Sequence, residues 1–481
     1  MKQNNTWVSW NENLKHDYSN LFKVTTEVEL IDAISKSDKI RFFGSKQSSA
    51  DIAANLPNLI DINAYDKILS YDENNLEITV QSGIKLSTLL DAVEAKGWCI
   101  PCLPDINTVT IGGAIATGTH GTSGKLLSEY MVSCRLVLAN GSIKEIKEGD
   151  DLMDAVRVSI GTLGVMSTLT FKCEPIYTLH VKEGPENDNV WLPKINERLE
   201  KHDFLRVLWL PHTNNGYVII GDKIDPNTPV KTNMGPSYLK HRRNTSKALY
   251  KYSGKYPWIT AIANKLLYFG FFRSKKEHKG SLYQATVTKS RGSTLELAEW
   301  TVALDKFPDL FKELKILINK WSNDSFIHIP MDVRFVKKDK SWLSYAYNQD
   351  TVTVGCVCRN AADADSYEAF HTVEQLFLKY GGRPHWGKRF AAKDKTLSNI
   401  YPKWEAFKKL RKELEFLTAE DKLELEELRG DPDETADIYD TIVGDLVDDD
   451  VDDLSEVEKQ DLGISDNDRR EDYYPIDDEG K

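Results

Sequence analysis

The chain has 481 residues, 41% hydrophobic and 10% aromatic, so it is long enough to bury a large core and form two or more domains. It begins Met1-Lys-Gln-Asn-Asn-Thr-Trp7, without an apolar stretch, so we expect no signal peptide. Six cysteines without a framework spacing argue against a disulfide-rich secreted protein and predict a reducing, cytoplasmic setting.

Charge is unevenly distributed along the chain, whose net charge is −12. Residues 431–481 contain 21 acidic and 4 basic residues, whereas the other 430 contain 53 acidic and 58 basic residues. An acid-rich segment such as Asp448–Asp453 cannot bury itself, which predicts a disordered acidic tail over 431–481. A solvated tail is the preferred interpretation, and a segment that touches the basic body is the alternative.

Short strands and helices alternate over residues 20–175. A turn at Ala139-Asn-Gly141 joins two of the strands into a hairpin. The mixture predicts an α+β fold in which antiparallel hairpins occur among βα units. The predicted strands are Phe22–Thr25, Lys39–Phe43, Leu59–Ile62, Lys67–Tyr71, Glu77–Gln81, Ser133–Leu138, Ser142–Ile146 and Val165–Phe171, and the helices are Glu27–Ser35, Leu86–Lys96 and Asp151–Ser159.

Longer strands follow over about 176–380, at Phe204–Leu210, Gly216–Gly221 and Thr351–Val357. With helices predicted at 296–321 and 364–380, the pattern indicates an antiparallel sheet covered by helices on one side.

The most apolar stretch of the chain is 256–272, which is too short and too polar to span a membrane. A core or interface helix is the preferred interpretation. A membrane-surface helix is the alternative, because Arg273, Lys275 and Lys276 follow.

Cys99-Ile-Pro-Cys102 has the spacing of a redox pair. The pair follows a predicted helix and a glycine instead of starting a helix, so a structural role is expected. A single pair supplies only two ligands, so no metal site is expected.

The glycine-rich segment Thr110–Gly124 contains five glycines, small or hydroxyl-bearing side chains and one histidine. Its free N–H groups suit a flat or anionic partner, which a dinucleotide cofactor is. The segment lacks the Gly-Lys-Ser/Thr ending of a phosphate-binding Walker loop and the Gly-x-Gly-x-x-Gly nicotinamide fingerprint. A tightly packed turn that binds nothing is the alternative.

Three further motifs carry chemistry. Arg41–Ser49 ends a strand in a small-residue turn suited to phosphate. Asp332 and Arg334 are two apart, so on a strand they share one face. Arg383–Phe390 combines cations, aromatic surface and ring nitrogens. Taken singly, the second motif is also consistent with an ordinary ion pair and the third with a surface loop.

Together these motifs resemble the FAD-linked oxidoreductases of the vanillyl-alcohol-oxidase (PCMH) type, in the branch of sugar-1,4-lactone oxidases or dehydrogenases and alditol oxidases. They occur in the family's order and cover roughly residues 7–414. The matching segments are Trp10–Leu14, Gly44–Ser48, Thr110–Gly124, Ser159–Gly164, Asp332–Phe335 and His385–Lys388.

The resemblance implies a two-subdomain FAD-binding domain at 1–175, an antiparallel-sheet cap domain at 176–380 that shapes the substrate site, and a segment at 381–430 that returns to the flavin. It implies these cofactor-binding residues: Gly44, Ser45, Lys46, Gln47, Ser48, Gly112, Gly113, Thr117, Gly118, Thr119, His120, Gly121, Thr122, Gly164 and Val165.

The resemblance also implies transfer of a hydride from a CH–OH group of a sugar-like polyol or aldonolactone to flavin N5. Arg334 and Lys388 would stabilise the developing alkoxide, and Asp332 would bind substrate hydroxyls. Lys388 also qualifies as the proton acceptor if its pKa is depressed, and His385 belongs to the same catalytic run. Oxygen or a redox partner would reoxidise the flavin, and no nucleic-acid partner is expected.

Two alternatives stay open: a non-catalytic flavin-binding protein on the same scaffold, and an FAD oxidoreductase acting on a lipid-linked sugar. The chain departs from the family pattern in three places. Gln47 stands where many relatives carry a flavin-linked histidine, which predicts non-covalent FAD. Asp332 is one methylene shorter than the usual glutamate, and a charged helix over Leu410–Leu428 replaces the usual ending.

Overall fold

The computed structural model describes residues 5–37, 39–122, 124–232, 241–242, 244–246, 248–249, 252, 256–282, 296–320, 330–358 and 364–414. These residues belong to one compact unit, Met1–Ile442. The predicted acidic tail at 431–481 lies outside the described residues. So does the end of the predicted helix at 410–428, which the structure describes as helical up to residue 414.

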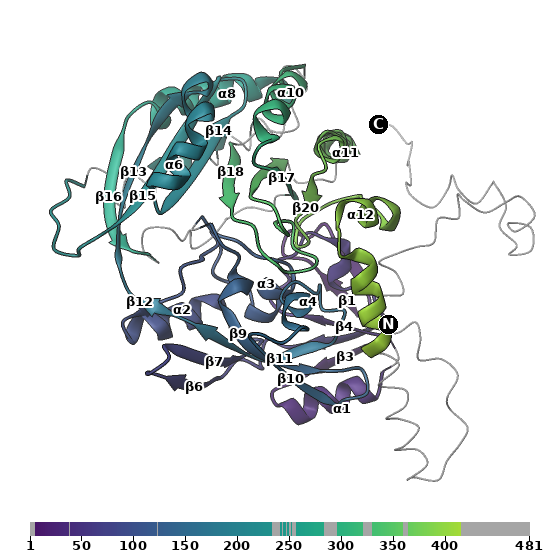
Figure 1. Cartoon of the computed structure of the whole chain (residues 1–481). Helices are drawn as coiled ribbons and strands as arrows, with labels where there is room; N and C mark the ends of the chain where they lie inside the picture. Colours follow the sequence, from purple (N-terminus) through teal and green to yellow (C-terminus); the bar gives the residue numbers. More distant parts are fainter. Residues whose placement is uncertain are drawn as a thin grey trace, which may run out of the picture. The chain divides into compact units, whose positions relative to one another are not determined.

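A three-stranded and a five-stranded sheet form most of the N-terminal part of the fold (Figure 1). The first is parallel, in the order β3 (Asn20–Lys23), β5 (Asn58–Asp61), β4 (Ile40–Phe43). The second is antiparallel, in the order β10 (Ile143–Lys147), β9 (Met131–Val137), β11 (Val165–Lys172), β7 (Glu77–Gln81), β6 (Ile68–Asp72). This mixture confirms the predicted α+β class.

Helix α1 (Glu27–Ser35) joins the two sheets through a shared core. Thr26 and Glu29 form a capping box at its N-terminus, which satisfies otherwise unpaired backbone N–H groups. Its buried face packs with Ile60 of β5 and Val137 of β9. The 3.6-residue spacing of Leu30, Ala33 and Ile34 therefore produces both the helix and its contact with the sheets.

The glycine-rich segment is partly helical, whereas the sequence predicted a loop. Residues Ile111–Ala116 form α3, because the carbonyl oxygens of Ile84 and Ser82 accept its first N–H groups. The helix predicted at Asp151–Ser159 shrinks to α4 (Met153–Val156), since the backbone turns left-handed at Ile160 and Gly161. The remaining N-terminal elements are β1 (Thr6–Val8), β2 (Lys15–Asp17), α2 (Leu86–Ala95), β8 (Trp98–Cys99) and β12 (Glu174–Pro175).

An eight-stranded antiparallel sheet follows, in the order β16-β13-β15-β14-β18-β19-β17-β20. Helices cover one of its faces, around a core that includes Trp191, Trp300 and Phe311. The strands are β13 (Thr178–Asn187), β14 (Phe204–Leu210), β15 (Asn215–Ile224), β16 (Lys276–Ser281), β17 (Glu296–Ala303), β18 (Met331–Val336), β19 (Thr351–Cys358) and β20 (Arg383–Pro384), and the covering helices are α5 (Asp188–Trp191), α6 (Ile195–Lys201), α10 (Phe307–Lys320) and α11 (Ala364–Lys379).

The helix predicted at 296–321 is wrong in its first third. Residues 296–303 form strand β17, in which Ala298, Trp300 and Val302 point into the helix-covered core. A short run that is apolar at alternate positions is compatible with both structures, and the pairing with β19 selects the strand here. The helix itself begins at Phe307 as α10.

The apolar stretch at 256–272 is helical as predicted, with a 3₁₀ turn (Pro257–Ile259), α8 (Thr260–Leu267) and a π-helical turn (Tyr268–Phe272). Within the described ranges, none of the helices combines the length and the apolar character needed to cross a bilayer. Helix α12 (Asp394–Ile400) follows the last strand of the sheet.

Cys99, Cys134 and Cys173 are buried thiols that form no disulfide, and Cys102 and Cys356 are buried as well. Burial raises the pKa of Cys99 to about 12, so this thiol is a poor nucleophile. These properties agree with the structural role expected for the Cys-x-x-Cys pair, and the reducing compartment stays a prediction.

Candidate active site

A cavity of about 480 Å³ lies between the open face of the eight-stranded sheet and the N-terminal segments. Its volume falls within the range of small-molecule sites. The turn after β4, the segment around α3 and residues 160–166 line it from the N-terminal part of the chain. Residues on strands β14, β17 and β18, together with the segment 385–388, line it from the sheet. The cavity therefore collects every chemical motif that the sequence singled out.

Most of the predicted site residues line this cavity. The catalytic candidates Asp332, Arg334, His385 and Lys388 do so. The predicted cofactor-binding residues that line it are Gly44, Ser45, Lys46, Gln47, Ser48, Gly112, Gly113, Thr117, Thr119, His120, Gly164 and Val165. Gly118, Gly121 and Thr122 are outside this lining, and their contact with a cofactor stays a prediction.

The glycines of the α3 region serve two different purposes. A Cβ on Gly121 would lie 2.4 Å from the carbonyl oxygen of Leu103, and one on Gly112 would lie 2.9 Å from the Cβ of Ser82. Both positions thus need glycine because the chain packs against itself. Gly113 differs, since a Cβ there would meet only Thr110 Oγ1, at 3.4 Å. Its missing side chain leaves room in the cavity.

Arg41 supplies a buried positive charge to the cavity wall. The residue is 5% exposed, and its Nε donates to the carbonyl oxygen of Ile52 at 2.6 Å. Burial lowers its pKa to about 10, with no acidic side chain among the described residues offsetting that effect. A buried guanidinium without a carboxylate is stabilised by an anionic ligand. The phosphates of a dinucleotide match this requirement.

The turn after β4 presents backbone and small side chains to the cavity. Lys46 adopts a left-handed φ of 57°, and its ammonium lies over the ring of Phe43 at 5.2 Å. Gln47 follows it on the cavity wall. Ser49 N–H donates to the carbonyl oxygen of Gly387 at 3.0 Å, which ties this turn to the C-terminal run.

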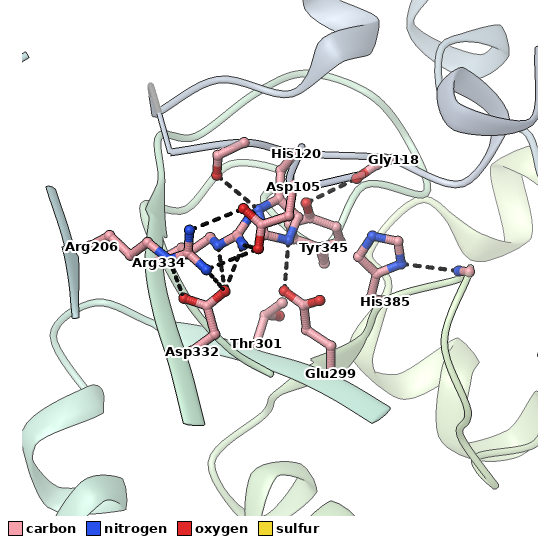
Figure 2. A network of polar contacts seen from close by, with 12 residues as sticks. Asp105, Gly118, His120, Arg206, Glu299, Thr301, Asp332, Arg334, Tyr345 and His385 are labelled. Atoms are coloured by element: carbon pink, nitrogen blue, oxygen red, sulfur yellow. Dashed lines mark hydrogen bonds and ion pairs between the residues drawn. The ribbon is translucent and has the colours of Figure 1, made fainter. Parts of the chain in front are cut away.

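A cluster of two arginines and two aspartates occupies the sheet side of the cavity (Figure 2). Arg206 of β14 donates to Asp332 of β18 from Nε and Nη2, each at 2.8 Å, and to Asp105 at 3.0 and 2.9 Å. Arg334 bonds Asp332 at 2.6–2.8 Å and Asp105 at 2.6 Å. Each guanidinium therefore binds both carboxylates, and the four formal charges cancel.

Strand alternation places this cluster. Val333 and Phe335 of β18 pack into the helix-covered core, so Asp332 and Arg334 face the cavity. This confirms that they share a face. Burial by itself lowers the pKa of Arg334, but Asp105 and Asp332 outweigh burial and raise it, so the guanidinium stays charged.

A second polar cluster joins His120, Glu299 and His385. His120 Nε2 lies 2.6 Å from Glu299 Oε1, and His120 Nδ1 lies 3.2 Å from the carbonyl oxygen of Gly121. A carbonyl oxygen only accepts hydrogen bonds, so Nδ1 is a donor. Although burial opposes it, His120 holds the pKa of Glu299 well below its usual range. With Glu299 ionised, its short contact with His120 Nε2 is a charge-assisted hydrogen bond.

His385 is neutral and its tautomer is fixed. Burial lowers its pKa to about 3, and its Nδ1 accepts the N–H of Gly387 at 3.0 Å. The proton of the neutral ring is therefore on Nε2. Backbone pairing explains this position, since the N–H of His385 donates to the carbonyl oxygen of Glu299 at 3.0 Å.

The ligand atoms of His120, Glu299 and His385 lie within 4.8 Å of one another, as in many metal sites. The distance of 2.6 Å between His120 and Glu299 is instead that of a direct, charge-assisted hydrogen bond. Two ligands each about 2.0–2.2 Å from one ion lie farther apart in tetrahedral geometry. The cluster is therefore better described as a hydrogen-bonded His120–Glu299 pair beside the neutral imidazole of His385.

Tyr345 and Arg383 fix the chain segments that lie beside His120 and His385. The Tyr345 hydroxyl donates to the carbonyl oxygen of Gly118 at 2.9 Å, and its ring stacks on His385. Arg383 Nη1 donates to the carbonyl oxygens of Tyr345 and Tyr347. The loop that orients His385 is thus fixed by a buried guanidinium.

The sequence interpretation missed Asp105, Arg206 and Glu299, and it gave Arg41 no individual role. Arg206 did leave a signal, because it is a charged residue within the otherwise apolar strand Phe204–Leu210. Glu299 was hidden by the wrong helix prediction, and Asp105 lies in a loop without periodicity.

The class of protein follows from family models. A model described as FAD binding domain matches residues 20–147, and one described as D-arabinono-1,4-lactone oxidase matches residues 169–415. The protein is an FAD-dependent oxidoreductase. More particularly, since the second match covers over half of the sequence, the chain belongs to the D-arabinono-1,4-lactone oxidase family.

Individual relatives agree with this assignment. L-gulono-1,4-lactone dehydrogenase of Mycobacterium tuberculosis is 29% identical over 420 residues, which cover 85% of this chain and 95% of the relative. L-gulonolactone oxidase of Mus musculus is 27% identical, with 80% and 88% covered. Among solved structures, a solvent-stable cholesterol oxidase matches with a TM-score of 0.68 at 15% identity, covering 85% of this chain and 94% of that one, which shows a shared fold.

Proposed function

We propose that this enzyme oxidises a CH–OH group of a sugar 1,4-lactone, using non-covalently bound FAD. The observation that carries the proposal is the charge-balanced cluster of Asp105, Arg206, Asp332 and Arg334, beside the His120–Glu299 pair in one cavity. A lactone presents several hydroxyls and a carbonyl, which such a set of donors and acceptors suits. The names of the relatives support this substrate class.

The cofactor fits the arm of the cavity that is lined by backbone and small side chains. Arg41 and the turn at 44–48 would hold the pyrophosphate, and Gly113 would allow its close approach. When bound, FAD supplies the acceptor for two electrons. Gln47 offers no nucleophile for a flavin bond at the position where relatives carry histidine, which supports non-covalent binding.

Asp332 and Arg334 would bind the substrate, and Arg206 would position Asp332. Fixed guanidinium charges stabilise an oxygen that gains negative charge as its C–H bond breaks. Arg206 compensates for the shorter Asp332 side chain, because it fixes that carboxylate from the neighbouring strand. Lactones differ in the positions of their hydroxyl groups, so hydrogen bonding to the Asp332 carboxylate would discriminate among them.

Lys388 remains the proposed proton acceptor. Glu299 is a poor base, since its pKa is held low by His120, and His385 donates from Nε2. Lys388 lines the cavity and lies close enough to Glu299 and His385 to influence the pKa values of both. In its neutral form it would take the hydroxyl proton.

We also propose the domain roles suggested by the sequence. Residues 1–175 hold the cofactor, residues 176–380 shape the substrate site, and residues 381–430 return to the flavin. Oxygen or another acceptor would remove the electrons. The expected cytoplasmic location belongs to the same proposal.

Flavin reduction without oxygen tests this function. The purified enzyme is mixed anaerobically with sugar 1,4-lactones and, separately, with alditols, and bleaching of the flavin is followed. We expect rapid bleaching with a lactone and a loss of about 10²–10³-fold in rate for Arg334→Met. Arg198→Met, which removes an ion pair with Glu186 outside the cavity, is the matched control and should leave the rate unchanged. Flavin that no lactone or alditol reduces would favour the non-catalytic alternative.

A further inference from the structure

The helical segment at 256–272 is apolar on two opposite sides. Its inner side, with Leu267, Phe271 and Phe272, packs against Leu210 and Tyr217 of the eight-stranded sheet. Such packing anchors the segment firmly to the fold. The inner contacts are enough to explain why the segment is helical, but they do not involve its outer side.

The outer side exposes a continuous row of large hydrophobic side chains. Trp258, Ile262, Leu266 and Phe269 are 54–62% exposed, and their spacing of three or four residues places them along one face. Tyr252 and Tyr256 are exposed just before them. Half of the twelve exposed large hydrophobics among the described residues thus fall within 252–269. A cluster of this kind marks an interaction surface.

The same part of the chain is strongly basic. Residues 226–276 contain eleven lysines and arginines and not one aspartate or glutamate, in a chain whose net charge is −12. Lys265 and Arg273 are exposed beside the apolar row, and the Arg273 guanidinium lies over the ring of Phe269 at 5.8 Å. The partner of this surface must therefore offer both apolar depth and negative charge.

We propose that the 252–273 surface docks the enzyme on an anionic lipid bilayer, with α8 lying in the plane of the interface. Aromatic side chains suit the headgroup level, and aliphatic side chains reach the acyl boundary. The segment is too short to span, in agreement with its shape as a surface helix. The inner side agrees with the core helix that the sequence first suggested, and the exposed outer row is what the membrane-surface alternative requires.

One residue connects the buried side of the helical segment to the proposed substrate site. Leu208 packs against the cluster that holds the segment and also lines the cavity. The docking proposal itself does not depend on which substrate the cavity takes.

Vesicle flotation of the full-length, FAD-loaded protein tests this docking. We expect binding to phosphatidylcholine vesicles that contain phosphatidylserine, and weak binding to pure phosphatidylcholine. Each basic residue near an anionic surface contributes about fivefold to binding, so Lys265→Glu with Arg273→Glu should weaken it about 25-fold or more. The matched control Lys312→Glu with Lys409→Glu makes the same charge change at exposed sites elsewhere and should bind like the wild type.

The apolar contribution is tested separately. Ile262→Ser, Leu266→Ser and Phe269→Ser together should abolish binding, whereas Ile316→Ser, at a similarly exposed position on α10, should not change it. Flavin content and melting temperature report that each variant is folded. Equal binding by the triple variant and the wild type, or no binding to anionic vesicles, would overturn the proposal. So would a wild-type dimer that the triple variant dissociates without any vesicle binding, since the surface would then belong to a second copy.

Discussion

Arg206 and Asp332 lie on the neighbouring strands β14 and β18, and two hydrogen bonds of 2.8 Å join them in a side-on pair. The family pattern usually has the longer glutamate at position 332. In this chain the carboxylate is held from both sides, by Arg206 and by Arg334, so two guanidiniums fix its orientation. Arg206 is thus a positioning residue that the motif alone does not reveal.

Removing Arg206 should lower the efficiency of substrate oxidation without preventing the protein from folding and binding flavin. In Arg206→Met, Asp105 and Asp332 share only Arg334, and the cluster gains one net negative charge. We expect kcat/KM for the lactone to fall about 10- to 100-fold, as for the loss of a charged hydrogen bond. Steady-state kinetics and flavin content measure this. An unchanged kcat/KM in a variant with full flavin would refute the positioning role.

The two kinds of glycine in the α3 region predict opposite behaviours. Gly121→Ala forces a Cβ against a backbone carbonyl oxygen, so we expect a loss of about 3 kcal/mol of stability. Gly113→Ala meets no backbone and should keep or slightly raise the melting temperature of the apoprotein, while weakening FAD binding. Thermal unfolding and FAD titration of both variants distinguish them. Equal FAD affinity in Gly113→Ala and the wild type would contradict the assignment of this residue to the cofactor.

Arg41 should contribute to FAD affinity through charge. We expect Arg41→Met to raise the dissociation constant of FAD about tenfold or more, because a charged hydrogen bond to phosphate is lost. Riboflavin, which lacks the pyrophosphate, serves as the control ligand, and its affinity should change little. A similar loss for both ligands would indicate a general disturbance of the cavity instead.

His385 predicts how stability depends on pH. Its pKa is lowered from 6.5 to about 3 in the folded protein, so between these values the unfolded chain binds a proton that the native protein does not. Stability from this residue is therefore complete above pH 6.5 and is lost as the pH falls, by about 1.4 kcal/mol per pH unit.

The matching variant is His385→Asn. Denaturant unfolding between pH 4 and 7 should show a shallower pH dependence for this variant than for the wild type, with the difference growing toward low pH. Parallel curves for the two proteins would show that the buried imidazole is not responsible.

Acid precipitation tests the mode of flavin attachment. Because Gln47 occupies the turn position, we expect all of the flavin to appear in the supernatant after the protein is precipitated. Yellow colour that stays with the pellet would show a covalent bond and would overturn the prediction of non-covalent FAD.

The sequence predicted much of the scaffold because local patterns determine it. Helix α1 and strands β7 and β14 have their predicted bounds, because capping residues and the alternation of apolar and polar residues can be read from the sequence alone. Strand β17 was missed, because only its pairing with β19 distinguishes it from a helix. The catalytic motifs could be grouped through their family resemblance.

The partners of those motifs could not be predicted in the same way. Asp105 and Arg334 are 229 residues apart and His120 and Glu299 are 179 apart, and the ion pairs depend on strand order rather than on spacing. Arg41 acquires its meaning only through burial, which the sequence does not show.

The hydrogen bond from Ser49 to Gly387 spans nearly the whole described chain. One part of the cavity wall comes from the first fifty residues and an adjoining part from residues 385–388. The ribosome therefore completes the cavity lining only after residue 388 has been synthesised, long after the glycine-rich segment has emerged. We then expect FAD to bind stably only once residues 385–388 have folded against the turn after β4.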